Sequence, residues 1–205
     1  MSKGEVVLLD CWASPFSMRV KIALEEKGVQ REDRAENLLG ERVSCYSPHQ
    51  KVPVLLHDGK PICESTIIVC YIDEVWPAQP LLPTCLYARA HARFWADFID
   101  KKVYEAGGRI WRSNGEAQEA GKEEFIQDYF GGECFAFIDI IAIALTSWFV
   151  AYEKIAGFKV EDHCPKFSAW IKRCLQRQSV AKVLPDPEEI YEFVLTLRKM
   201  QGIEW

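Results

Sequence analysis

The chain divides into a first part in which strand and helix patterns alternate and a second part with helix patterns alone. Residues 77–86 contain three prolines and separate the two parts, as a linker does. This order predicts a small mixed sheet with helices, followed by an all-helical domain. We expect domains at residues 1–79 and 87–205, joined by a linker at 80–86.

Local signals place the individual elements. The apolar run at residues 6–9 predicts a buried strand. Ser14 and Pro15 suit the N-cap and first position of a helix, and Gly28 suits its end. The Asp-Gly pair at 58–59 predicts the tight turn of a hairpin. In chain order we expect a strand at 6–9, a helix at 15–27, a weak polar strand near 30–36, a hairpin at 54–63, a helix from Ser65, and later helices at 89–111, 116–127, 136–155, 165–176 and 187–200.

Composition and charge exclude several classes of protein. With 49% hydrophobic and 27% charged residues, the 205-residue chain is globular rather than disordered. The net charge of −5 and the lack of a basic cluster argue against nucleic-acid binding. The most apolar stretch, residues 138–150, is too short for a membrane span and contains Asp139.

The cysteines and the N-terminus indicate the compartment. None of the eight cysteines forms a C-x-x-C pair, and no Cys/His cluster has zinc spacing, so we expect no metal site. The charged N-terminal residues do not form a signal peptide. We therefore expect a cytoplasmic protein with reduced thiols.

Three short segments carry residues suited to chemistry, and the first of them is the start of the first helix. The Ser14 hydroxyl follows a strand and begins a helix, a position that favours anions and could donate a hydrogen bond to a thiolate. The alternative is a serine that only caps the helix. Lys51-Val52-Pro53 marks a strand start, and its X-Pro bond could be cis. Glu64 and Ser65 offer a second anion site, unless they are a solvated acid and a simple cap.

An ordered set of motifs over nearly the whole chain resembles one family. The motifs are SPF, KVPVL, DGKPICES, YIDEVW, RFWADFIDKKVYE and CPKFSAWIKRC. Together they are similar to the tau class of plant soluble glutathione transferases. The resemblance implies an α/β thioredoxin-like N-terminal domain, an all-α C-terminal domain, a homodimer, and glutathione as co-substrate without a metal.

The resemblance also implies the glutathione-binding residues. Ser14 matches the catalytic serine, which donates to the glutathione sulfur. Lys51 matches a lysine that contacts the glycyl carboxylate, and Val52 matches the residue whose backbone pairs with the cysteinyl part. Glu64 and Ser65 match the pair that holds the γ-glutamyl end. These roles agree with the chemistry of each side chain.

The implied reaction is conjugation of the glutathione thiolate to hydrophobic electrophiles, in detoxification or stress response, with hydroperoxide reduction as a possible companion. The electrophile pocket would lie between the domains, and Phe16, Tyr104, Trp111 and Trp170 are its candidate residues. Aromatic residues at helical spacing are also typical of a core.

Two segments depart from the family pattern. Residues 38–50 are shorter than the family pattern by about three positions and lack a lysine that contacts the glycyl end. Arg42 is the candidate replacement, although arginine and lysine are not equivalent. At residues 127–128 the helix expected at 116–127 lacks roughly a dozen residues of the family pattern, several turns at ~1.5 Å per residue. We expect the first departure to affect the affinity for glutathione. We expect the second to lower the stability of the helical domain.

Two other functions are compatible with the sequence. One is a non-catalytic carrier of apolar ligands or glutathione conjugates between the domains. The other is a thiol transferase with Cys11 as its nucleophile. A cysteine-based thiol transferase would need its cysteine at position 14, where this chain has serine.

Overall fold

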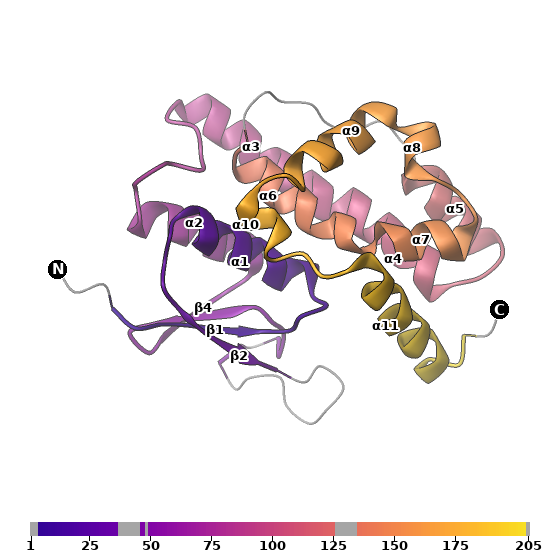
Figure 1. Cartoon of the computed structure of the whole chain (residues 1–205), viewed down its shortest axis with the longest axis horizontal. Helices are drawn as coiled ribbons and strands as arrows, with labels where there is room; N and C mark the ends of the chain where they lie inside the picture. The colour runs from indigo at the N-terminus through magenta and orange to yellow at the C-terminus, as the bar shows by residue number, and fades with distance from the viewer. Residues whose placement is uncertain (1–3, 37–45, 48, 126–134, 204–205) are drawn as a thin grey trace. The chain divides into compact units, whose positions relative to one another are not determined.

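The computed structural model divides the chain into two compact units, Met1–Cys85 and Leu86–Trp205. Each unit is described by itself below (Figure 1). The structure describes residues 4–36, 46–47, 49–125 and 135–203.

The first unit is built on a four-stranded mixed sheet with the order β2-β1-β3-β4. β1 pairs in parallel with β2, and β3 runs antiparallel to both β1 and β4. The thioredoxin-like fold expected from the sequence is thereby confirmed. The elements are β1 (Val6–Asp10), α1 (Pro15–Glu26), β2 (Glu32–Ala35), β3 (Val54–His57), β4 (Lys60–Cys63) and α2 (Ser65–Val75).

The residues predicted to begin and end the first helix lie at the ends of α1. Ser14 is the N-cap of α1, and Pro15 is its first residue. Gly28 follows the helix in the left-handed conformation, with φ 61°, which suits a residue without Cβ. α1 and α2 pack side by side on one face of the sheet (Figure 1). Because β1 and β4 run in the same direction, the helices that follow them both begin at the same edge of the sheet.

A buried ion pair joins the end of α1 to α2. The Lys27 ammonium donates to Asp73 Oδ1 at 2.7 Å, and their side chains are 0% and 8% exposed. Asp73 also accepts from the backbone N–H groups of Leu81 and Leu82, at 2.7 and 3.0 Å. Lys27 further donates to the carbonyl oxygen atoms of residues 78 and 79. This cluster, the Lys27–Asp73 clamp, therefore holds the segment that leads out of the first unit.

The described residues of the second unit form helices, as expected. The helices are α3 (Leu86–Ile99), η1 (Asp100–Tyr104), α4 (Glu105–Arg112), α5 (Glu116–Phe125), α6 (Phe137–Ile143), η2 (Ala144–Trp148), α7 (Phe149–Ala156), α8 (Val160–His163), α9 (Pro165–Cys174), α10 (Gln178–Ala181) and α11 (Pro187–Met200).

Two long predicted helices contain irregular turns. The helix expected at 89–111 includes the π-helical turn η1, and the helix expected at 136–155 includes the 3₁₀ segment η2. The four-residue helices α8 and α10 were not predicted, because a single turn has no apolar periodicity to detect. Such turns inside long helices are frequent at functional positions.

Candidate active site

Three chain segments meet at one edge of the sheet. Leu9 of β1 pairs with Val54 of β3, so the segment before Val54 lies beside the end of β1 that leads to Ser14. Val54 also pairs with Cys63 of β4, so the residues after Cys63 lie beside that same segment. The pairing register therefore brings Ser14, the Lys51-Val52 segment and the Glu64-Ser65 pair to the same edge of the sheet.

The Ser14 hydroxyl keeps its hydrogen available. Its Oγ accepts a hydrogen bond from the Ser17 backbone N–H at 3.3 Å, which makes it the cap of α1. A hydroxyl that accepts one bond still has an O–H to donate. Capping and donation to a ligand are thus compatible roles of the same side chain.

The Lys51-Val52 segment and the α2 N-terminus complete the edge. The Val52–Pro53 peptide bond is cis, as the sequence analysis considered, and Lys51 is exposed. Glu64 is exposed and has φ 69° and ψ 114° at the N-cap of α2. This conformation costs a residue other than glycine about 1–3 kcal/mol, and such strain gathers at functional sites. The backbone at Glu64 is therefore a second indication of a site here.

A buried arginine that the sequence analysis missed lies beneath this edge. The Arg19 side chain is fully buried, its Nη1 donates to Ser65 Oγ at 3.3 Å, and its guanidinium lies 4.9 Å from the centre of the Phe16 ring. Arg19 thus links α1 to the start of α2 and adds positive charge where both helix N-termini favour anions. Its position on the buried face of α1 was the available signal, since a charged residue there needs a partner.

Cys11 is unsuited to nucleophilic chemistry. Burial raises the pKa of its thiol, and the nearby Asp10 carboxylate raises it further, against lowering by backbone hydrogen bonds and Lys21. A buried thiol with a raised pKa has little of the reactive thiolate form. The geometry therefore favours Ser14 over Cys11 as the residue that acts at this edge.

In the second unit, two of the predicted pocket residues share a cationic neighbour. The Arg112 guanidinium lies 4.7 Å from the centre of the Trp111 ring, and Arg112 Nη2 donates to the Tyr104 hydroxyl at 3.4 Å. Trp111 is buried and Tyr104 is half-buried. Arg112 is therefore a further candidate residue of the electrophile pocket, which the sequence analysis did not name. The available signal was its position next to Trp111 and eight residues after Tyr104.

Trp170, a third predicted pocket residue, is engaged in packing. Its indole N–H donates to Asp139 Oδ1 at 2.7 Å, and its ring stacks on Phe167 with centroids 5.0 Å apart. Asp139 Oδ2 accepts from the Ala136 backbone N–H at 2.8 Å, as expected for the acid of a capping box. Because Ala136 has no side-chain acceptor, only half of that box forms. The role of Trp170 in the pocket stays a prediction, and its contacts favour a structural role.

The variant Trp170→Phe separates these two roles. Removing the indole N–H leaves Asp139 Oδ1 buried without this donor, and we expect the free energy of unfolding to fall by about 1–3 kcal/mol. The KM for an electrophilic substrate should not change. Urea unfolding and steady-state kinetics measure the two effects, and Phe167→Leu serves as a packing control. A raised KM with unchanged stability would instead assign Trp170 to the pocket.

Some predicted features lie outside the described residues. Arg42, most of segment 38–50 and the shortened helix at 127–128 belong to this group. Among the residues that are described, no group of three or more His, Cys, Asp or Glu side chains is placed to hold a metal ion. Within the same residues, no helix combines the length and apolar character of a membrane span.

Comparison with known proteins identifies the family of the chain. The family described as "Glutathione S-transferase, N-terminal domain" matches residues 8–80. Glutathione S-transferase U25 of Arabidopsis thaliana is 51% identical, with 98% of each chain covered. The chain belongs to the glutathione S-transferases, in their tau class. The probable glutathione S-transferase parC of Nicotiana tabacum is 50% identical over the full length of both proteins.

Solved structures of the tau class share the fold of this transferase. Rice GST1, solved in complex with glutathione, has a TM-score of 0.90 at 40% identity and covers 98% of this chain and 99% of its own. The tau-class enzyme from mango has a TM-score of 0.86 at 35% identity and covers 96% of this chain and 100% of its own. The relatives of this chain are named as transferases, which supports glutathione conjugation as its function rather than the carrier alternative.

The comparison also bears on the shortened segments. The alignment with the tobacco protein extends over 221 positions and includes all 205 residues of this chain. Sixteen of these positions (221 − 205) therefore hold no residue of this chain.

Proposed function

We propose that glutathione binds at the sheet edge formed by Ser14, the Lys51-Val52 segment, Glu64 and Ser65. The observation that carries the proposal is the convergence of two helix N-termini and the Ser14 hydroxyl at one edge. Glutathione has two carboxylates, an ammonium group and a thiol. This edge offers a group of suitable chemistry for each of them.

Each residue has a proposed partner on glutathione. The Lys51 ammonium binds the glycyl carboxylate, and the Val52 backbone pairs with the cysteinyl part. The Glu64 carboxylate accepts from the γ-glutamyl ammonium, while Ser65 and the α2 N-terminus bind the adjacent carboxylate. Arg42 remains a proposed further cation for the glycyl end.

In the proposed mechanism Ser14 acts as a hydrogen-bond donor. Its hydroxyl stabilises the thiolate, which lowers the thiol pKa and increases the fraction of reactive sulfur at neutral pH. The thiolate attacks an electrophilic carbon, and the leaving group departs with the bonding electron pair. Ser14 is neither nucleophile nor general base. Proximity of the two bound substrates supplies the remaining acceleration.

The electrophile side of the proposal rests on aromatic residues. Phe16 in the first unit and Tyr104 and Trp111 in the second are proposed to contact hydrophobic electrophiles. With an organic hydroperoxide, the same thiolate would attack the terminal oxygen, break the O–O bond and release the alcohol. A second glutathione would then convert the resulting sulfenic acid to the disulfide and water. From the family resemblance we also propose a cytoplasmic homodimer.

Ultraviolet difference spectroscopy of bound glutathione across pH tests the site. We expect a thiolate band that titrates at least one unit below the pKa of about 8.5 of a free thiol. S-methylglutathione, which has no thiol, is the matched control for changes in protein absorbance. A titration at the free-thiol value would remove the role of Ser14, and a failure of glutathione to bind would refute the site.

A further inference from the structure

The Arg112 guanidinium lies beside two aromatic rings at the end of α4. It is 4.7 Å from the centre of the Trp111 ring and 6.0 Å from the centre of the Tyr104 ring, and its Nη2 donates to the Tyr104 hydroxyl. Within the described ranges, no carboxylate lies within ion-pair distance of Arg112. Because arginine keeps its charge at physiological pH, this side chain is a fixed positive charge beside the two rings.

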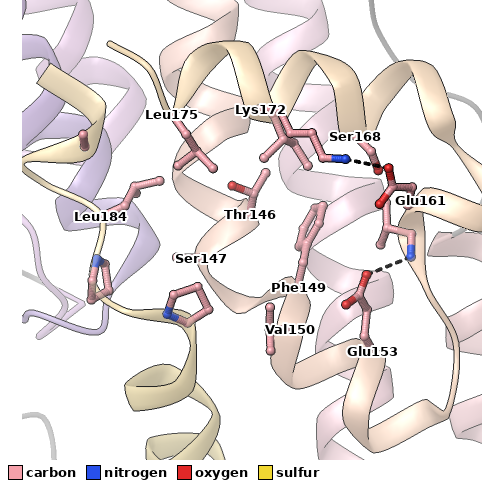
Figure 2. Close-up of a pocket in the computed structure, with 15 residues that line it drawn as sticks. Thr146, Ser147, Phe149, Val150, Glu153, Glu161, Ser168, Lys172, Leu175 and Leu184 are labelled. Carbon is pink, nitrogen blue, oxygen red and sulfur yellow. Dashed lines mark hydrogen bonds and ion pairs between the residues drawn. The ribbon is translucent and has the colours of Figure 1, made fainter. Parts of the chain in front are cut away.

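Other cations of the helical unit are already paired with acids. The Lys101 ammonium lies 2.8 Å from Asp97, and the Lys172 ammonium lies 2.6 Å from Glu161. Figure 2 shows the second of these pairs. A ligand anion would have to compete with the carboxylate of such a pair. Arg112 needs no such competition, because its contacts are with aromatic side chains.

Gly108 makes room for the guanidinium. Tyr104, Gly108 and Arg112 follow one another at intervals of four residues, about one helical turn each. Helix side chains lean toward the N-terminus, so the Arg112 side chain passes over Gly108 on its way to Tyr104. A Cβ on Gly108 would lie only 3.1 Å from Arg112 Nη1. Glycine is otherwise unfavourable inside a helix, and here it allows the cation to lie against the rings.

The guanidinium keeps hydrogen-bond donors for a ligand. Its N–H groups form a planar fork, and the bond to the Tyr104 hydroxyl uses one of them. Stacking on Trp111 orients the fork in advance, so a ligand has less side-chain motion to restrict. Such a fork binds a carboxylate through two parallel hydrogen bonds. Arg112 is exposed, which allows a carboxylate to reach it.

We propose that Arg112 is a specificity-determining residue of the electrophile pocket and that this transferase favours hydrophobic electrophiles that carry a carboxylate. The apolar body of the substrate contacts the Trp111 and Tyr104 rings, and its carboxylate binds the guanidinium. This inference rests on the proposed role of Tyr104 and Trp111 and adds a charge preference to it. The reaction is the same conjugation: the thiolate forms a C–S bond, and the leaving group departs with the electron pair of the bond that breaks.

Two aryl chlorides that differ in one group measure the preference in the full chain. 4-Chloro-3,5-dinitrobenzoate has a carboxylate opposite the chlorine, and 4-chloro-3,5-dinitrobenzamide has a neutral amide there. Dividing each kcat/KM by the uncatalysed rate constant with glutathione removes the difference in intrinsic reactivity. We expect the normalised value for the benzoate to be higher by about fivefold or more, and the difference to shrink at high salt. Equal normalised values overturn the proposal.

Three variants locate the preference, and the ratio of the two normalised values is the measurement because any loss of folded enzyme cancels in it. Arg112→Gln removes the charge and should lower the ratio to about one. Gly108→Ala keeps the charge but places a Cβ against the guanidinium, and should lower the ratio about two- to threefold. Arg173→Gln makes the same charge change at an exposed residue of α9 and should leave the ratio unchanged. A ratio that stays high in Arg112→Gln overturns the proposal.

Binding of unreactive analogues separates this proposal from the proposed function. 3,5-Dinitrobenzoate and 3,5-dinitrobenzamide have no chlorine to displace, so isothermal titration calorimetry with glutathione present gives their Kd values without turnover. The benzoate should bind more tightly by about fivefold or more, and Arg112→Gln should abolish the difference. If both chlorides are conjugated without a charge preference, the proposed function stands and the Arg112 proposal fails. If neither is conjugated, the proposed function fails, and equal Kd values of the analogues overturn the Arg112 proposal as well.

Discussion

Replacing Ser14 by alanine should lower kcat about 10²- to 10³-fold while the KM for glutathione changes less than threefold. Removal of one hydrogen-bond donor to an anion that forms during catalysis lowers kcat by about 10²- to 10³-fold in other enzymes. The Ser14 hydroxyl still has its O–H to donate after it accepts from Ser17 N–H. Steady-state kinetics with an aromatic halide and the thiolate titration measure the effect, and the thiol pKa should return toward about 8.5.

Helix capping needs a separate control, because Ser14 is also the N-cap of α1. Alanine at an N-cap costs about 0.5–2 kcal/mol of stability, whereas glycine costs only a few tenths. Ser14→Gly should therefore lose activity as fully as alanine with little change in unfolding. Ser14→Thr retains a hydroxyl and should keep most of the activity. Equal turnover in the alanine and wild-type proteins would show that Ser14 only caps the helix.

Replacing Asp73 by asparagine should lower the free energy of unfolding of the first unit by about 3–5 kcal/mol. This is the usual effect of removing one partner from a buried ion pair, because the other charge remains buried. In the Lys27–Asp73 clamp, the Lys27 side chain is 0% exposed and would lose its carboxylate partner. Urea unfolding monitored by circular dichroism measures the loss.

The effect of Asp73→Asn on stability should depend on pH. Burial alone would raise the pKa of Asp73, but the Leu81 N–H, the Lys27 ammonium and the Leu82 N–H outweigh it, so the pKa is lowered. A carboxyl whose pKa is lowered on folding stabilises the protein above its unfolded pKa of about 3.9. That stabilisation is lost as the pH falls through the lowered folded value. The stability difference between wild type and Asp73→Asn should therefore be constant near neutrality and narrow below about pH 4.

Two further variants control this prediction. Asp97→Asn breaks the exposed pair between Asp97 and Lys101, whose side chains are 60% and 67% exposed, and should cost less than about 1 kcal/mol. The double variant Lys27→Met/Asp73→Asn should lose less than the two single variants added together, because neither charge is left buried alone. A strictly additive double variant would show that the clamp is not a coupled pair.

Local sequence signals were sufficient for most elements of the fold. Ser14 with Pro15 began α1, and the Asp-Gly pair at 58–59 joined β3 and β4 as expected. These signals depend on the conformation of a few adjacent residues, so they can be read without the rest of the chain. The π turn η1 and the 3₁₀ segment η2 were not predicted, because apolar periodicity continues across both.

The candidate site was predicted through the order of its motifs rather than through residue chemistry alone. Taken singly, Ser14 and Ser65 each read as a simple helix cap. Their convergence depends on the pairing of Leu9 with Val54 and of Val54 with Cys63, which a linear sequence does not state. Arg19 was missed for the same reason, since its partner Ser65 is 46 residues away.

The amino-acid sequence by itself determined the class of fold, the positions of the caps and turns, and the family, since these follow from short-range patterns and ordered motifs. Only the tertiary structure decided which distant side chains meet: Lys27 with Asp73, Arg19 with Ser65, and Trp170 with Asp139. The cavity lined by residues of η2, α7 and α9 belongs to this second group. Volumes and buried contacts are properties of packing between elements, and packing is settled only when the elements come together.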